Sequence, residues 1–477
     1  MPKPMLLIIL ACQQPAPKDS GSTDTTDTTN TTAGTDSAAD TDSGDTTADA
    51  ATGVEARIDA EFGTLVYASW QQHTAADAWV EYSFEEGSWL SSPPVSVTDG
   101  EQEALLLGIP YGVVVTLRVV SDLGEATATS EEVTIATDPL PASLPVPEVL
   151  IDTPTDQAPE AEWIFMSITE EGGGVTALYS DWWVFIMDRQ GRIVWARETP
   201  SDSATLHPRI AYDGTALLIE EGTFWGGGFD FGTNSIVQRM TLDGAVSQVW
   251  STPGLHHAYT DTADGAMVWA ANAYTNETLE MLTAEGESVT IWDCKAHLHS
   301  VGLTGDCGSN SIYWHEPTDT FLYSFYSLFT MFEITTAGEV LRTFGPLETA
   351  WDFEPAESTF WWQHGGYYTE AGTLLVSTHL DEAGTETIVR EFSLEEDSET
   401  LTEIWSFGIG DGIWGEYMGE PLRLSNGNTL HNTGSVARLR EATPAGEVVW
   451  DVSWGDASSS SWIGRSTPVS DLYALVE

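Results

Sequence analysis

Three histidines of this chain stand at a nearly constant distance before a turn glycine. The spacing is seven or eight residues in each case: His207 before Gly214, His257 before Gly265 and His364 before Gly372. A neutral imidazole can attack an electrophile through its free ring nitrogen, and a protonated one can supply a proton near neutral pH. Equal spacing in separate strands would place the three rings at one end of a shared channel. The alternative is structural, because a repeated fold can keep a histidine that hydrogen-bonds to its neighbour.

The strands that carry these histidines belong to a repeated unit. From about residue 158 onward, strands joined by glycine turns recur, and each unit ends in a strand with a large aromatic residue. Six such closing strands lie 42 to 61 residues apart and end at Trp195, Trp250, Trp292, Phe344, Trp405 and Trp450. That period accommodates four strands per unit, as in a propeller blade, and no helical period accompanies it. The pattern predicts an all-β chain with a six-bladed β-propeller over residues 158–477.

Two arginines occur on the same set of strands. Arg209 lies two residues after His207 and therefore on the same face of its strand. The comparable strand in "EPLRLSNGNTLHNTG" has no histidine at the shared position and offers Arg423 instead. We expect Arg209 or Arg423 near the histidines, where a cation could bind anionic oxygens of a substrate.

The region before the repeats has a different pattern. Residues 54–140 contain short alternating segments such as "LVYASWQ" and "VVVTLRVVS", separated by turn residues. This pattern is typical of a small β-sandwich of the fibronectin or immunoglobulin kind. The proline spacing of "DPLPASLPVPEV" then predicts a semi-rigid linker over residues 141–157.

The first residues resemble a bacterial lipoprotein signal. Residues 1–12 hold one Lys, an apolar run and the ending Ile9-Leu10-Ala11-Cys12, and they are too short to cross a bilayer as a mature helix. The resemblance to a lipobox implies that Cys12 is acylated. Gln13, where an aspartate would signal inner-membrane retention, implies an outer-membrane lipoprotein facing the periplasm or the cell surface. The alternative is a buried helix with an incidental cysteine. Residues 13–53, nearly all Thr, Asp, Ser, Ala and Gly, predict a disordered, extended tether.

The charge of the chain limits its partners. It has 16 basic and 74 acidic residues, for a net charge of −58. Such a surface repels phosphates, so we exclude nucleic acid as a partner and expect membrane contact only through the lipid anchor. The acidity itself is explained by solubility.

Two cysteines remain beyond the lipobox. Cys294 and Cys307 lie close together in "CKAHLHSVGLTGDC", and in an oxidising compartment such a pair usually forms a disulfide. Together with His297 and His299 they could instead bind zinc, but their spacing matches no familiar zinc pattern. We therefore expect a disulfide and no metal.

Four motifs in the repeats resemble one enzyme family. They are "HH" with a following "DG" at 256–265, "NSIYW" at 310–314, "QH" with "GTLL" at 363–375, and "LSNGNTLHNTG" with "TPAGEVVW" at 424–450. These motifs resemble those of the bacterial aryl-sulfate sulfotransferases, a family of six-bladed propellers with a small β-domain in front. The resemblance covers about residues 155–477.

The resemblance implies a specific reaction and specific roles. Members of the family move a sulfuryl group from an aryl sulfate to a phenol through a sulfated histidine, without a cofactor. By motif, His364 would be the nucleophile and His257 would hold or protonate oxygens. The expected partners are a small aromatic donor and a small aromatic acceptor. The expected substrate-binding residues are His207, Arg209, His256, Asn310 and Arg423.

The chain departs from the family pattern at two points. Gly308 stands where the family has a histidine, and Phe325 and Tyr326 occupy the region where it has an arginine. Half of the expected cationic site is therefore missing from its usual positions. The alternative function is a non-catalytic propeller lipoprotein that binds a ligand or a partner at the cell surface.

The lipobox generates a first prediction. Cys12→Ala removes the only thiol that the signal offers for acylation, so the variant should lose acyl labelling and its enrichment in the membrane fraction. Fractionation together with radiolabelled fatty acid measures both. Unchanged labelling and fractionation of the variant would show that Cys12 is not the anchor.

Overall fold

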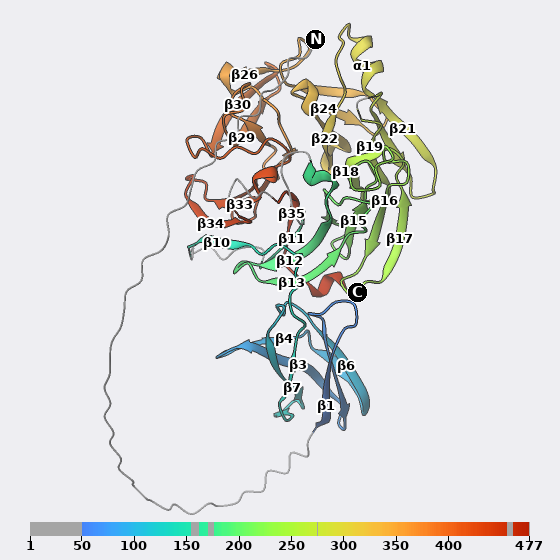
Figure 1. Cartoon of the computed structure of the whole chain (residues 1–477), viewed down its shortest axis with the longest axis vertical. Coiled ribbons are helices and arrows are strands. Elements are labelled where there is room, and N and C mark those ends of the chain that lie inside the picture. The colour runs from blue at the N-terminus through green and yellow to red at the C-terminus, as the bar shows by residue number, and fades with distance from the viewer. Residues whose placement is uncertain (1–49, 154–161, 170–175, 274, 456–460, 477) are drawn as a thin grey trace, which may run out of the picture. The chain divides into compact units, whose positions relative to one another are not determined.

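The computed structural model describes residues 50–153, 162–169, 176–273, 275–455 and 461–476. Strands dominate these residues, so the prediction of an all-β chain is confirmed (Figure 1). The predicted signal with Cys12 and nearly all of the predicted tether lie outside the described residues. None of the helices that are described has the length and apolar character needed to cross a bilayer.

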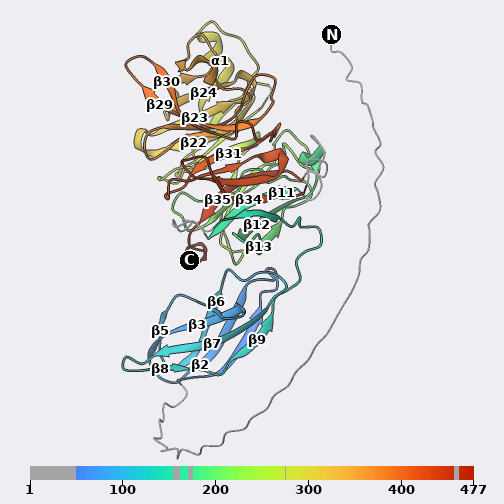
Figure 2. The same ribbon diagram turned by 90° about the vertical axis from the view of Figure 1, so that its left-hand side faces the viewer.

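Residues 51–136 form two antiparallel sheets (Figure 2). The first has the order β1-β2-β6 and comprises β1 (Ala51–Ile58), β2 (Val66–Gln72) and β6 (Gly100–Leu106). The second has the order β4-β3-β7-β8, with β5 on β3 and β9 on β7, and comprises β3 (Ala76–Glu85), β4 (Ser88–Ser91), β5 (Val95–Val97), β7 (Val114–Asp122), β8 (Thr127–Thr129) and β9 (Val133–Ala136). Alternate side chains of both sheets share one apolar core that includes Trp70, Tyr82 and Leu117. Strand β1 begins at Ala51, so the predicted tether ends earlier than residue 53.

The described residues from 148 to 469 form six further sheets of four or five strands. Four of them have four strands. These are β11 (Trp163–Thr169), β12 (Trp182–Asp188) and β13 (Ile193–Glu198) with β35 (Ile463–Val469); β14 (Arg209–Ile210), β15 (Leu217–Glu221), β16 (Ile236–Met240) and β17 (Val246–Ser251); β18 (Leu255–Asp261), β19 (Met267–Ala271), β20 (Thr278–Leu282) and β21 (Ser288–Asp293); and β22 (Ser309–His315), β23 (Thr320–Phe325), β24 (Thr330–Thr335) and β25 (Val340–Phe344).

The other two sheets have five strands. One, in the order β26-β30-β29-β28-β27, comprises β26 (Asp352–Glu354), β27 (Gly366–Tyr368), β28 (Leu374–His379), β29 (Thr387–Glu395) and β30 (Thr400–Phe407). The other, in the order β10-β34-β33-β32-β31, comprises β10 (Glu148–Asp152), β31 (Glu420–Arg423), β32 (Thr429–Asn432), β33 (Arg438–Ala442) and β34 (Val448–Ser453). The arrangement is propeller-like, and Figure 1 shows β18 and β35 near its centre with β17 and β21 at its rim.

The six closing strands of the sequence pattern each lie in a different sheet: β13, β17, β21, β25, β30 and β34. Three strands were not expected, and one of them, β26, pairs in parallel with β30. Strand β10 falls within the predicted linker of residues 141–157, yet it pairs with β34. The backbone groups at the open edge of β34 find hydrogen-bond partners in the five extended residues of β10. Strand β35 pairs with β11 and completes the first of the six sheets from the far end of the chain.

The turn glycines explain why His257 and His364, which have the same spacing, lie at matching positions on their segments. Gly265 and Gly372 have φ angles of +85° and +77°, a conformation that an L side chain rarely adopts. Each donates its backbone N–H to the carbonyl oxygen three residues earlier, Thr262 at 2.9 Å and Thr369 at 2.8 Å. The turn therefore has a fixed length, and a residue at a fixed distance before it lies at a fixed height on the preceding strand.

Seven short helical segments occur in the described residues. They are α1 (Cys294–Ser300) and the 3₁₀ turns η1 (Thr176–Tyr179), η2 (Glu316–Thr318), η3 (Tyr326–Leu328), η4 (Ala356–Ser358), η5 (Gly434–Val436) and η6 (Tyr473–Leu475). Helix α1 begins where the Asp293 carboxylate accepts the Ala296 N–H at 2.8 Å.

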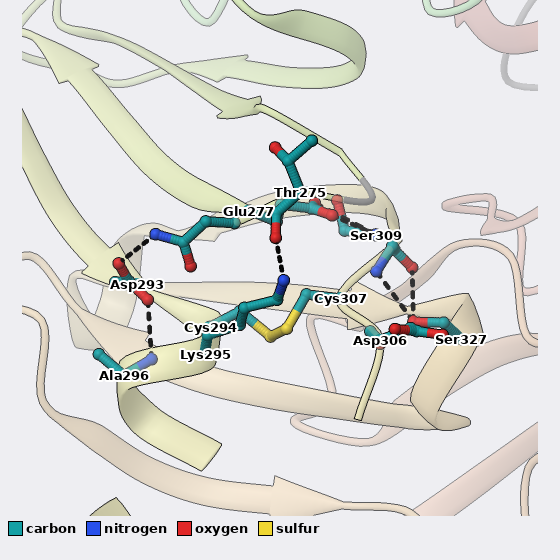
Figure 3. The surroundings of a disulfide bond; sticks show 12 residues. Thr275, Glu277, Asp293, Cys294, Lys295, Ala296, Asp306, Cys307, Ser309 and Ser327 are labelled. Carbon is teal, nitrogen blue, oxygen red and sulfur yellow. Dashed lines mark hydrogen bonds between the residues drawn. A yellow bond between two sulfur atoms is a disulfide. The ribbon is translucent and has the colours of Figure 1, made fainter. Parts of the chain in front are cut away.

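Cys294, the first residue of α1, and Cys307 are joined by a disulfide, with their Cα atoms 6.2 Å apart (Figure 3). Their sulfur atoms are bonded to each other and do not serve as zinc ligands, and His299 is exposed on α1. Among the described residues, no group of three or more His, Cys, Asp or Glu side chains is arranged to hold a metal ion.

Candidate functional site

A cavity of about 210 Å³ lies among the first strands of several sheets. All three histidines of the shared register line it, and each comes from a different sheet or from the loop before one. Its other polar lining includes Asn310, Glu420 and Arg465. Aromatic rings form much of the remaining wall: Trp225, Tyr326, Tyr417 and Trp462. The cavity is thus an aromatic pocket with a few convergent polar groups, the usual form of a small-molecule site.

One ring nitrogen of His364 makes a hydrogen bond and the other does not. Its Nδ1 lies 3.1 Å from the carbonyl oxygen of Trp362, which can only accept, so Nδ1 carries the proton. Within the described residues Nε2 has no hydrogen-bond partner. Burial lowers the pKa of His364 to about 3, with the charges of His379 and Arg465 acting in the same direction. The ring is therefore neutral at neutral pH, with a lone pair on Nε2, as a nitrogen nucleophile requires.

The backbone before His364 is strained and firmly held. Trp362 has a φ angle of +52°, which is uncommon for a bulky residue. Gln363 is fully buried, donates to the carbonyl oxygens of Phe325 and Thr330 at 3.0 and 3.2 Å, and accepts the Asn310 side-chain N–H at 2.6 Å. Asn310 thus lines the cavity and also fixes the loop that presents His364.

His257 and His207 lie side by side in the cavity wall, with ring centroids 5.5 Å apart. Burial lowers the pKa of both well below the ordinary value, and Arg465 adds to the effect on each. His256, expected to bind substrate, does not line the cavity. It is buried, its Nδ1 meets Nδ1 of His257 at 2.7 Å, and its Nε2 meets Glu277 at 3.2 Å. Adjacent residues of a strand point to opposite faces, and a register shift between Leu255 and Tyr259 allows the two rings to touch.

The cation of the cavity is Arg465, which the sequence analysis did not identify. It is nearly buried, and Nη1 donates to Glu420 at 3.0 Å. A signal existed, since Arg465 is the sole basic residue of β35. Strand β35, however, pairs with β11 from a distant part of the sequence. No glycine turn follows it, so the spacing rule of the histidines does not apply to it.

The buried carboxylates near Arg465 do not make the cavity anionic. Burial raises the pKa of Glu220 to about 8, against the backbone N–H groups of Leu206 and His207 that lower it. At neutral pH Glu220 is therefore mostly protonated. Glu420, whose pKa is also raised by burial, remains as the partner of Arg465. The carboxylate that lines the cavity is therefore paired with a guanidinium.

The two arginines expected in the cavity lie elsewhere. Arg423 donates to the carboxylate of Glu391 and, at 3.0 Å, to the carbonyl oxygen of Gly427. It stands four residues before the turn glycine Gly427, and at 3.3 Å per residue it is about 13 Å along the strand from the shared position, which Gly419 occupies. Gly419 does line the cavity.

Arg209 is also displaced along its strand. Two residues after His207 place it about 7 Å further along, where Nη1 donates to the carbonyl oxygen of Tyr259 at 2.6 Å. It lines a separate cavity with Asp261 and Trp314. Arg209 is close enough to lower the pKa of His207 but does not reach the same cavity.

The two positions that depart from the family pattern hold no cation. Gly308 and Phe325 are buried, and Phe325 lies in an apolar cluster with Tyr323 and Phe332. Tyr326 lines the cavity with its ring centroid 4.9 Å from that of His364. Arg465, from a different sheet, supplies the positive charge instead.

No family model matches this sequence, and a comparison with curated proteins finds no match. Solved structures with some likeness include a protein of unknown function from Bacteroides caccae, at 14% identity over 64% of this chain and 99% of that one, with a TM-score of 0.43. A streptogramin B lyase is 12% identical over 67% and 97% of the two chains, with a TM-score of 0.39. A luciferin-regenerating enzyme is 10% identical over 69% and 94%, with a TM-score of 0.36. None of these likenesses carries an argument about what this chain does.

The environment of His364 predicts how it titrates. Its ring should stay neutral, with the proton on Nδ1, down to about pH 3, because burial opposes the charged form. Long-range ¹H–¹⁵N NMR, assigned with His364→Gln, measures both the tautomer and the midpoint. Because the folded-state pKa lies below the unfolded value of about 6.5, this ring lowers the free energy of unfolding as the pH falls from 6.5 towards 3. A midpoint near 6.5 would contradict the assignment.

Proposed function

We propose that the six sheets of residues 148–469 are the blades of a six-bladed β-propeller, and that the two sheets before them form a β-sandwich. We further propose that the cavity transfers a sulfuryl group from an aryl sulfate to a phenol through a sulfated histidine. The observation that carries the proposal is His364: a neutral ring with a free Nε2 in an aromatic cavity that also contains a buried guanidinium. A phenyl ring can stack on the walls while the sulfate lies towards Arg465.

The proposed reaction has two steps, and His364 takes part in both. In the first, Nε2 attacks sulfur, the N–S bond forms, the ester S–O bond breaks, and His257 gives the departing phenolate a proton. In the second, the oxygen of the acceptor phenol attacks sulfur, the N–S bond breaks, and the phenol proton returns to His257. Neither step requires a cofactor.

Arg465 is proposed to stabilise the charge that develops on the sulfuryl oxygens. In the described part of the chain its side chain donates a hydrogen bond to Glu420 alone, so other N–H groups of the guanidinium are available to a ligand. A fixed, buried cation stabilises such charge more strongly than one in solvent. The lipobox supports a further proposal, that Cys12 anchors this enzyme in the outer membrane.

Sulfation of His364 can be tested directly. Incubating the wild type with 4-nitrophenyl sulfate and no acceptor should release one equivalent of 4-nitrophenol and add the mass of one sulfuryl group. Peptide mapping should place the group on His364, and His364→Gln should neither gain mass nor release phenol. His315→Gln, which removes a histidine outside the cavity, is the matched control. A wild type that gains no mass and releases no phenol would favour a binding protein over an enzyme.

The role of Arg465 can be separated from its structural pairing. Arg465→Gln should slow sulfuryl transfer by about 10²- to 10³-fold, and it should also destabilise the fold because Glu420 is left buried without a positively charged partner. The double variant Arg465→Gln/Glu420→Gln should recover thermal stability but not the rate. Recovery of the rate in the double variant would show that Arg465 acts through structure alone.

A further inference from the structure

His257, the proposed acid of the reaction, is not charged in its resting environment. Burial, His256, His364 and Arg465 together hold the pKa of His257 well below its ordinary value, so the ring is neutral at neutral pH. A neutral imidazole whose proton is on Nδ1 has none on Nε2 to give. An acid at this position therefore needs a second group that holds a proton in reserve.

Three side chains form a continuous path that ends at His257. Glu277 Oε1 lies 3.2 Å from His256 Nε2, and His256 Nδ1 lies 2.7 Å from His257 Nδ1. Two nitrogens at 2.7 Å must share one proton, because two bare lone pairs would repel each other and two N–H groups would clash. The proton between the rings can therefore belong to either histidine. Only His257 reaches the cavity, so a proton moved along this path is delivered there.

Glu277 is built into the fold as an acceptor. Its side chain is fully buried, and both of its oxygens are within 3.1 Å of the Ser309 N–H (Figure 3). The Tyr323 O–H donates to Oε1 at 2.7 Å, and burial beside Glu277 raises the pKa of Tyr323 well above its usual range, so it stays a donor. Because a carboxylate only accepts hydrogen bonds, His256 Nε2 is the donor in its contact with Glu277. The His256 ring also contacts the ring of Phe224 edge-on, with centroids 5.7 Å apart.

We propose that Glu277 and His256 form a proton relay, in which His256 stores the proton that His257 delivers to the leaving phenolate. The inference rests on the proposed sulfuryl transfer. In the resting state His256 is an imidazolium that donates Nε2–H to Glu277 and Nδ1–H to His257, whose own proton is on Nε2. The Glu277 carboxylate compensates the positive charge, while His257 stays neutral among Arg465, His207 and His364.

Each half of the reaction moves the relay once. As the ester S–O bond breaks, Nε2–H of His257 passes to the phenolate oxygen and Nδ1–H of His256 passes to Nδ1 of His257. His256 is then neutral with Nε2–H on Glu277. When the acceptor phenol attacks, its proton goes to Nε2 of His257 and the proton on Nδ1 returns to His256. One proton leaves in the first step and one returns in the second, so the cycle balances.

The dependence of rate on the leaving group tests the relay. Glu277→Gln keeps the size of the side chain but cannot compensate an imidazolium, and His256→Gln removes the ring that carries the proton. Sulfation from phenyl sulfate, whose phenolate needs a proton, should slow about a hundredfold in both variants. Sulfation from 4-nitrophenyl sulfate, whose phenolate leaves unprotonated, should stay close to the wild-type rate and also show that the variants are folded. Glu333→Gln, which makes the same change at another fully buried glutamate, should leave both rates unchanged.

A second measurement needs no variant. The sulfation rate of the wild type with phenyl sulfate, measured in mixtures of H₂O and D₂O, should depend on the deuterium fraction with the curvature of two protons moving together. A linear dependence, or equal slowing of both donors in both relay variants, would overturn the relay while sulfation itself still occurs. A wild type that is sulfated by neither donor would overturn the proposed function and the relay with it.

Discussion

A guanidinium buried against a carboxylate is the constraint on which the cavity depends. Arg465 and Glu420 have side chains only 8% and 4% exposed, and each would be very costly to bury without the other. Together they place a fixed positive charge beside the cavity without giving it a large net charge. Burial lowers the pKa of His207, His257 and His364, and Arg465 adds a smaller effect in the same direction, so all three rings are neutral at neutral pH. Neutrality suits a nucleophile, but a neutral ring is a poor acid, so the proposed reaction needs a second group that supplies the proton.

The two histidines of the proposed reaction therefore have different roles although both are buried and neutral. The proton of His364 is fixed on Nδ1 by a carbonyl oxygen, which leaves Nε2 permanently available. Nδ1 of His257 shares a proton with Nδ1 of a second ring, and in the proposed relay this allows Nε2 to alternate between donor and acceptor. The difference lies in the partner of one nitrogen, a carbonyl oxygen in one case and an imidazole in the other.

The sequence was sufficient for features that repeat locally. Alternation, turn glycines and closing aromatics predicted the all-β chain, and the fixed turn geometry brought His207, His257 and His364 to one cavity. Features that depend on distant pairing were not predictable. Arg465 reaches the cavity because β35 pairs with β11, and β10 joins β34, a strand about 300 residues away. Arg423 lies outside the cavity because it stands four residues, and not eight, before its turn glycine. His256 was misplaced because a local irregularity of β18 cannot be read from residue types.

The pairing of β35 with β11 also has a consequence for how the molecule is made. Met166 lies opposite Ser466, so the first of the six sheets stays open until a strand 300 residues further along the chain has been synthesised. At about 5 to 20 residues per second, that interval is roughly 15 to 60 s. During it, the apolar edge of β11 has no partner, and contacts between such distant residues form slowly. Arg465 lies on this late strand, so the ribosome adds the cation of the cavity after all three of its histidines.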